Sequence, residues 1–183
     1  SPFHRGKCIT RERMLAQCAK KNGVMVSYTN MVGGQDEIVF DGNSLIVDMH
    51  GQIMARAKAF EEDLLLADLK FESHHSRRIV SKKSRSSRYI SHYPIKTVMV
   101  SRAVKVRNKK PIFCKVASTL SPLEEIYRAL VTGVRDYVLK NNFSKVVIGM
   151  SGGIDSALTA VIAVDALGSD NVTGVLMPSS FTS

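Results

Sequence analysis

The spacing of hydrophobic residues changes from helical to strand-like early in the chain. Residues 11–23 (RERMLAQCAKKNG) place small and apolar side chains on one helical face, and Gly23 is a usual helix stop. Short apolar runs separated by turn residues follow, as in half-buried strands. These runs cover residues 24–29, 37–40, 44–49, 52–60 and 64–69. The pattern predicts one helix followed by a β-rich segment.

A second helix is predicted to begin after Ser121. Ser121 is a suitable N-cap, Pro122 suits the first helical position, and Glu124 completes a capping-box signature. Apolar residues then recur at helical spacing, and the helix should end near residues 141–142.

The last part of the chain has the pattern of a strand, a turn, a helix and a second strand. KVVIGM, residues 145–150, and VTGVLM, residues 172–177, are apolar runs typical of buried parallel strands. Residues 157–167 form a nearly all-apolar helix pattern, which Gly168 should stop. This order predicts a βαβ unit with a right-handed crossover, so the chain belongs to the α/β class.

The charge of the chain is concentrated in one segment. The net charge is +10 over 183 residues, yet residues 70–115 alone hold 14 Lys or Arg and a single acid, Glu72. A solvated connector is favoured over a nucleic-acid surface, because this stretch has no RNA-binding aromatic motif and no metal-finger spacing. We therefore expect three parts, at residues 1–72, 73–118 and 119–183.

The cysteines, the apolar runs and the first residues of the chain indicate the kind of protein and compartment to which it belongs. Cys8, Cys18 and Cys114 are widely spaced and form no CxxC pattern, which is typical of reduced thiols in a cytoplasmic protein. No apolar run approaches the roughly 18 residues that a membrane helix needs. SPFHRGK is neither a signal peptide nor a translation start, so we expect the chain to be a fragment.

The turn GMSGGIDSA, residues 149–157, is the best candidate for a functional site. It lacks the GxGxxG and Walker A patterns, but residues 149–153 match GxSxG, the motif of serine hydrolases. None of the five His residues follows Ser151, which weakens the hydrolase interpretation. The alternative is a phosphate-binding turn at a helix N-terminus, where backbone N–H groups and the helix dipole favour an anion.

The side chains of this turn fit the phosphate-binding alternative. Gly152 and Gly153 let the backbone approach phosphate oxygens closely, and Ser151 and Ser156 carry hydroxyl donors. Asp155 would repel a bare phosphate, so it fits only if it holds a hard cation such as Mg²⁺ that bridges the phosphates. A purely structural βα turn is the competing interpretation.

The stretch SGGIDS, residues 151–156, resembles the SGGxDS signature of the ATP pyrophosphatase superfamily. Members of that superfamily cleave ATP between the α and β phosphates and transfer AMP to a substrate oxygen. The resemblance implies ATP and Mg²⁺ as ligands, with Asp155 as the metal-binding residue. It implies an ATP site formed by Gly149, Met150, Ser151, Gly152, Gly153, Ile154, Asp155 and Ser156.

The flanking sequences resemble two different protein modules. Residues 124–138 (EEIYRALVTGVRDYV) and 174–183 (GVLMPSSFTS) resemble NAD synthetases. SPFHRGK, residues 28–60 and FEEDLLLADL resemble the C-terminal part of a nitrilase-type glutaminase. This pairing is the arrangement of the glutamine-dependent NAD synthetase family.

The family resemblance implies both a fold and an activity. The fold would be the C-terminal part of a nitrilase-like α/β sandwich, followed by the start of a Rossmann-like, parallel-sheet ATP-pyrophosphatase domain. The activity would be that of an ATP-dependent ligase that amidates deamido-NAD with ammonia from glutamine and releases AMP and pyrophosphate. We also expect a homo-oligomer in the full-length parent. The hydropathy argues against a membrane as partner, and the composition of the connector argues against nucleic acid.

In the glutaminase part, the family resemblance assigns a role to only two residues of this chain. The Glu, Lys and Cys that the nitrilase family uses precede the segment resembling SPFHRGK, so we expect no catalytic residue in this chain. Cys8 is thus not the nucleophile. The resemblance assigns glutamine contacts to Ser1 and Lys7, with a surface cation as the alternative for Lys7. We expect the isolated chain to be inactive.

Overall fold

The computed structural model describes residues 1–70, 110–176 and 178, and most of the expected connector, residues 73–118, lies outside these ranges. Residues 1–66 and 114–183 belong to one compact unit and residues 67–113 to another. In the second unit, the Ile112 N–H donates to Asp68 Oδ2 at 2.9 Å. The strand, helix and site descriptions below concern the first unit.

The first helix, α1, spans Lys7–Asn22 and confirms the helix predicted at residues 11–23. It ends at Gly23, whose φ is 63° and whose N–H donates to the Ala19 carbonyl. A left-handed residue at this place is the usual helix C-cap, and glycine adopts it without a steric penalty. The helix begins four residues earlier than expected, directly after Gly6.

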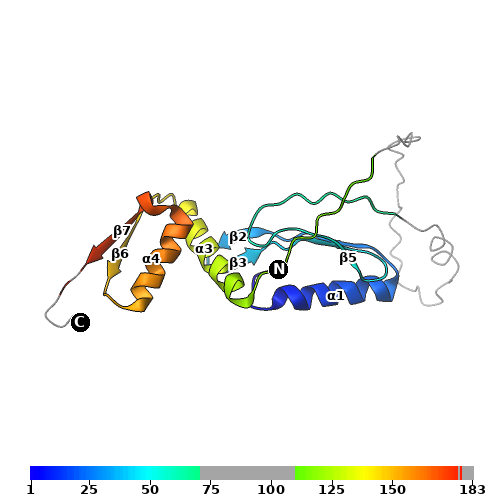
Figure 1. Ribbon diagram of the computed structural model, residues 1–183, viewed down its shortest axis with the longest axis horizontal. Helices are drawn as coiled ribbons and strands as arrows, with labels where there is room; N and C mark the ends of the chain where they lie inside the picture. Colours follow the sequence, from blue (N-terminus) through cyan, green and yellow to red (C-terminus); the bar gives the residue numbers. More distant parts are fainter. Residues whose placement is uncertain (71–109, 177, 179–183) are drawn as a thin grey trace, which may run out of the picture. The chain divides into compact units, whose positions relative to one another are not determined.

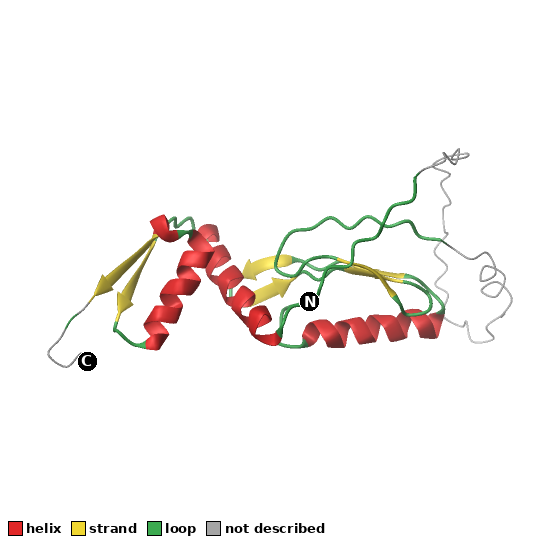
Figure 2. Cartoon of the chain, in the orientation of Figure 1, coloured by secondary structure: helices red, strands yellow, loops and turns green. Residues whose placement is uncertain are grey.

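Five short strands follow α1 and form two antiparallel sheets (Figures 1 and 2). Three of them pair in the order β1-β4-β5, and the other two form the β2–β3 hairpin. Ala19 of α1 packs with Leu45 and Val47 of β4, which makes a small buried core under the first sheet. The strand bounds are Val26–Tyr28 (β1), Val32–Gln35 (β2), Ile38–Asp41 (β3), Leu45–Val47 (β4) and Ile53–Arg56 (β5).

Two of the strand expectations differ from the structure. β2 has the sequence VGGQ and was not predicted, because two glycines are unusual inside a strand. The strand expected at residues 64–69 was wrong, since these residues have no regular structure. Leu64 and Leu66 are 78% and 57% exposed, so this apolar run is not covered by the described residues.

Helix α3, Pro122–Lys140, confirms the helix predicted from Ser121. The Ser121 hydroxyl accepts the Glu124 N–H at 3.3 Å, as an N-cap should. The Glu124 carboxylate does not complete the box, because it accepts a hydrogen bond from Arg128 at 2.9 Å instead. α3 packs against the β2–β3 hairpin on one side and α4 on the other (Figure 1).

The predicted strand, helix and strand are all present at the end of the chain. β6, Val146–Met150, leads through a turn into α4, Ile154–Leu167. A short 3₁₀ turn, Ser169–Asn171, then leads to β7, Val172–Leu176, which pairs with β6 in parallel from Val146↔Val172 to Met150↔Leu176. The parallel pairing is confirmed, and the right-handed crossover stays a prediction. The expected burial of the two strands was wrong among the described residues, because four of the five residues of β7 are exposed. Within the ranges described, no helix is long and apolar enough to cross a membrane.

Candidate functional site

The turn between β6 and α4 brings together all eight residues of the expected ATP site. Two of them end β6, three form the turn and three begin α4. Gly152 has a φ of 80°, and a Cβ built there would meet no atom of the described residues within 4 Å. A Cβ on Gly153 would meet only the Ser151 hydroxyl, at 3.5 Å. The turn therefore needs glycine for its backbone conformation, and its outer face is open to a ligand.

The two serines of the turn bond to each other and to its backbone. The Ser156 hydroxyl accepts the Ser151 N–H at 3.3 Å and donates to the Gly153 carbonyl at 2.9 Å. The two hydroxyl oxygens are 3.2 Å apart, and the Gly153 N–H donates to Ser151 Oγ at 3.4 Å. These bonds close the turn, so both hydroxyls shape the loop as well as lining it.

The start of α4 has the features of an anion site next to a cation ligand. Gly153 is the N-cap, and no side chain caps the first turn of this 14-residue helix. The first-turn N–H groups and the helix dipole favour a negative group there. Asp155 lies in the same turn and is exposed.

The residues present also fit a magnesium ion, although they would supply only part of its coordination. Among the described residues, no group of three His, Cys, Asp or Glu side chains could hold a metal ion. Mg²⁺ commonly binds through one or two carboxylates and completes its octahedron with phosphate oxygens and water. A single carboxylate beside a phosphate-binding turn is consistent with this mode of Mg²⁺ coordination.

The geometry around Ser151 does not resemble that of a serine hydrolase. The hydroxyl partner of Ser151 is the Ser156 hydroxyl. Of the two His residues in the described ranges, His4 contacts the Arg5 carbonyl through its ring, and His50 lies in a turn with Asp48. Neither supplies the base that a Ser nucleophile needs.

The second group of expected site residues lies at the start of the chain. The Ser1 main-chain nitrogen donates to Asn30 Oδ1 at 2.7 Å, and the Asn30 amide donates to the Ser1 carbonyl at 3.2 Å. Lys7 is the first residue of α1 and is half-buried. Within the part of the chain that the structure describes, the Lys7 ammonium has no hydrogen bond or ion pair, so it is available to an anionic ligand.

Cys8 has the environment of an inert thiol. It is 7% exposed, and its Sγ lies 3.8 Å from Glu12 Oε1. Burial, and then the Glu12 charge, raise the pKa of this thiol to about 11. Because the thiolate is the nucleophilic form, Cys8 is a poor nucleophile at neutral pH.

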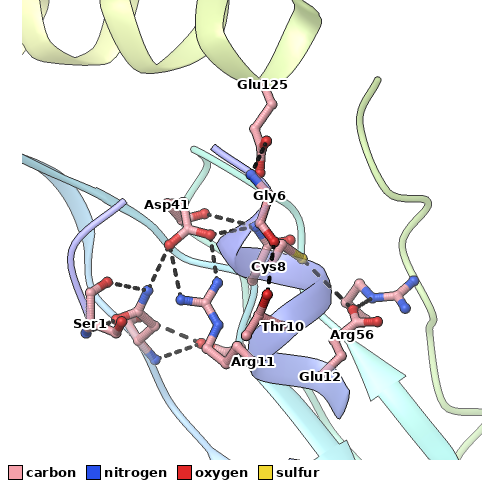
Figure 3. Close-up of polar contacts among 12 residues, drawn as sticks. Ser1, Gly6, Cys8, Thr10, Arg11, Glu12, Asp41, Arg56 and Glu125 are labelled. Carbon is pink, nitrogen blue, oxygen red and sulfur yellow. Dashed lines mark hydrogen bonds and ion pairs between the residues drawn. The ribbon is translucent and has the colours of Figure 1, made fainter. Parts of the chain in front are cut away.

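Sequence reasoning missed a buried polar network that lies beside Ser1 (Figure 3). Asp41 is 1% exposed, and its carboxylate accepts hydrogen bonds from both terminal nitrogens of Arg11. It also accepts from the amides of Asn30 and Asn43, at 3.0 and 2.8 Å. Four donors on one buried carboxylate satisfy the charge that burial would otherwise penalise. The only sequence signal was the turn dipeptide Asp41-Gly42.

Comparison with known proteins finds that the two ends of the chain are similar to different families. Residues 9–78 match the carbon-nitrogen hydrolase family, and residues 126–183 match the NAD synthase family. The "Glutamine-dependent NAD(+) synthetase" of Thermotoga maritima is 47% identical over 184 residues, which cover all of this chain and 31% of the relative. The protein of the same description from Aquifex aeolicus is 44% identical, over all of this chain and 32% of the relative.

The chain is homologous to the glutamine-dependent NAD(+) synthetases. A solved structure agrees: that of the synthetase from Acinetobacter baumannii in complex with adenosine diphosphate has a TM-score of 0.71 at 34% identity. The alignment covers all of this chain and 28% of the chain in that structure. The chain thus spans about a third of the length of the synthetases it matches. The comparisons support neither the hydrolase nor the nucleic-acid-binding interpretation.

The regions that match the two families contact each other in this homologue of the synthetases. The Gly34 N–H on β2 donates to Asp136 Oδ2 on α3 at 2.7 Å, and Lys140 on α3 donates to the Gly34 carbonyl. Glycine permits this approach, because a Cβ on Gly34 would lie 3.3 Å from the Gly133 Cα. Just outside the two matched ranges, a further bond joins the Gly6 N–H, next to Lys7, to Glu125 Oε2 at 3.2 Å. α3 is therefore the element through which the hydrolase-like part meets the synthase-like part.

Proposed function

We propose that these residues form the linked parts of a glutamine-dependent NAD(+) synthetase, an ATP-driven ligase that amidates deamido-NAD. The observation that carries the proposal is the open Gly-Ser turn with Asp155, which lies in the NAD synthase match of a chain that also matches carbon-nitrogen hydrolases. The corresponding division is a glutaminase part at residues 1–72, a basic connector at 73–118 and a synthetase part at 119–183.

In this reaction the carboxylate of deamido-NAD attacks the α-phosphorus of ATP and displaces pyrophosphate, which leaves an adenylate of deamido-NAD. Ammonia from glutamine then attacks the activated carbonyl carbon, AMP leaves, and NAD remains. The nucleophile of the first step is already ionised, so that step needs no general base from this chain. The task of the protein is to hold the attacking and leaving oxygens in line and to stabilise phosphate charge.

The residues of the turn are suited to that task. We propose that residues 149–156 bind ATP, with the first-turn N–H groups of α4 directed at the pyrophosphate. A relative that was solved with adenosine diphosphate supports nucleotide binding by this fold. Asp155 would hold Mg²⁺, which, when bound, neutralises part of the phosphate charge.

The glutamine site would use Ser1 and Lys7. The half-buried ammonium of Lys7, which has no partner among the described residues, suits the α-carboxylate of glutamine. We assign no catalytic role in glutamine hydrolysis to any residue of this chain, and the raised pKa of Cys8 agrees with that choice. The three free cysteines suit a reducing compartment such as the cytoplasm. A homo-oligomer, and inactivity of the isolated chain, stay predictions.

The proposal is tested with Asp155→Asn in the full-length protein. NAD formation is measured with ammonia as the nitrogen source, and glutamine hydrolysis is measured separately. Removal of one charge-stabilising group from a phosphoryl-transfer site should lower the rate of synthesis about 100-fold or more. Glutamine hydrolysis should stay within about twofold of the wild type, because Asp155 lies in the synthetase part.

Asp165→Asn is the matched control for this experiment. Asp165 lies on the same helix, and its Oδ2 accepts the Tyr127 hydroxyl at 2.6 Å, an acceptor role that an amide oxygen can retain. The control should synthesise NAD at close to the wild-type rate. Unchanged Mg²⁺-dependent synthesis by Asp155→Asn would rule out the role given to Asp155.

A further inference from the structure

The amide of Asn30 holds the backbone of Ser1 on both sides. Its Oδ1 accepts from the Ser1 nitrogen at 2.7 Å, and its Nδ2 donates to the Ser1 carbonyl at 3.2 Å. A side-chain amide that pairs with both polar groups of one residue mimics a strand partner. Because the two bonds fix the Ser1 backbone, they also limit where the Ser1 hydroxyl lies.

Asn30 is itself fixed in orientation. Its second amide hydrogen goes to Asp41 Oδ1 at 3.0 Å, and its main-chain N–H donates to the Ser44 hydroxyl at 3.0 Å. An amide has two N–H donors and one carbonyl acceptor group, and each of them is engaged here. A flipped amide would place its oxygen against the Asp41 carboxylate, which accepts but does not donate when ionised. The carboxylate therefore selects one amide orientation.

Asp41 is in turn held by groups that cannot easily move. Arg11 pairs with it through two nitrogens, and the side chains of this pair are 3% and 2% exposed. Such a buried bidentate pair has a defined geometry, since guanidinium and carboxylate are both planar. A continuous set of polar contacts thus runs from Arg11 on α1, through Asp41 at the end of β3 and Asn30, to Ser1 (Figure 3).

We propose that Asn30 is a positioning residue for glutamine binding: it holds Ser1 so that the Ser1 hydroxyl is placed for the substrate, and Asp41 and Arg11 fix its orientation. This inference rests on the proposed function, which assigns Ser1 to the glutamine site. It predicts that Asn30 affects glutamine binding specifically, rather than NAD synthesis as a whole.

The experiment compares Asn30→Ala and the isosteric Asn30→Asp with the wild type in the full-length protein. Asn30→Ala loses both contacts with Ser1, and Asn30→Asp loses the donor to the Ser1 carbonyl while placing a second carboxylate beside Asp41. The KM for glutamine should rise about tenfold in both, as expected for losing one or two hydrogen bonds. NAD synthesis from ammonia should stay within about twofold of the wild type.

Asn22→Ala is the matched control. Asn22 is an exposed residue of α1 whose amide donates to the Cys18 carbonyl at 2.8 Å, so the change also removes a bond from an Asn amide to the main chain. Its KM for glutamine should not change. A double variant, Ser1→Ala with Asn30→Ala, should resemble Ser1→Ala alone, because Asn30 acts through Ser1.

The possible results separate the inference from the proposed function. An unchanged KM for glutamine in both Asn30 variants would overturn the inference, as would a parallel fall in glutamine- and ammonia-supported synthesis. Additive effects of Ser1→Ala and Asn30→Ala would also overturn it. If the wild type makes no NAD from either nitrogen source, the proposed function itself is wrong.

Discussion

Gly33→Ala should destabilise the protein markedly, because Gly33 lies where the β2–β3 hairpin meets α3. Gly33 is buried, has a φ of 126°, and a Cβ built on it would lie 2.5 Å from Asp136 Oδ2. The carboxylate would have to leave this position. Asp136 Oδ2 is also the acceptor of the Gly34 N–H, so that bond would be lost with it.

The expected cost has two parts. A non-glycine residue in a sparsely populated backbone region costs about 1–3 kcal/mol. Losing a hydrogen bond to a charged group costs about 1.5–3 kcal/mol. The free energy of unfolding should therefore fall by about 3 kcal/mol or more. Gly168→Ala is the control, since Gly168 has a φ of 87° but no atom of the described ranges lies within 4 Å of an added Cβ, and only the backbone cost should remain.

Urea unfolding of the full-length protein measures the difference between the two variants. The midpoint of Gly33→Ala should fall further than that of Gly168→Ala at an unchanged m-value. In a double-mutant cycle, Asp136→Ala should cost less in the Gly33→Ala background than in the wild type, because the same contact is already lost. Equal destabilisation by the two glycine variants, or additive effects of Gly33→Ala and Asp136→Ala, would refute the steric argument.

Two further predictions concern the hydrolase-like part. The pKa of Cys8 is raised to about 11, so only about a thousandth of this thiol is thiolate at pH 8. Iodoacetamide should therefore modify the exposed Cys18 first, and it should modify Cys8 faster as the pH approaches 11. Mass spectrometry measures the labelling, and equal labelling of both cysteines at pH 8 would contradict this expectation. Arg11→Met leaves the buried Asp41 carboxylate without its ion pair and should lower the free energy of unfolding by about 3–5 kcal/mol. Arg13→Met, at an exposed position, should change the free energy of unfolding little. Equal urea midpoints for the two variants would show that the Arg11–Asp41 pair does not stabilise the fold.

The parts of the fold that were predicted correctly depend on local signals. Gly23 and Gly168 end helices because glycine adopts their positive φ values, 63° and 87°, without strain. Ser121 caps α3 through its own hydroxyl, and the apolar runs on either side of α4 are short and rich in β-branched residues, as expected for the parallel strands that they form. Each of these features is decided within a few residues, so the sequence pattern is sufficient.

The errors and omissions depend on contacts between distant residues. β2 has two glycines and little strand propensity, but α3 approaches it so closely that a Cβ on Gly33 would lie 2.5 Å from Asp136 Oδ2. The run at residues 64–69 has the apolar character of a strand, yet it lacks a partner among the described residues. Tertiary packing thus overrides local propensity in both cases.

The same distinction applies to the candidate sites. The eight residues of the β6–α4 turn are contiguous, so their motif was visible in the sequence. Asn30 contacts Ser1 from 29 positions away, and Arg11 contacts Asp41 from 30 positions away. No periodicity or motif links such residues, and only the folded structure brings them together.

We propose above all that this chain is part of a synthetase that splits ATP between its α and β phosphates and takes its nitrogen from glutamine. The most direct measurement follows the full-length protein with ATP, deamido-NAD and glutamine labelled with ¹⁵N at the amide, using ³¹P NMR for phosphates and mass spectrometry for the dinucleotide. The account predicts AMP and pyrophosphate in equal amounts, together with NAD that carries the ¹⁵N label. ADP and inorganic phosphate as products, or NAD without the label, would contradict it.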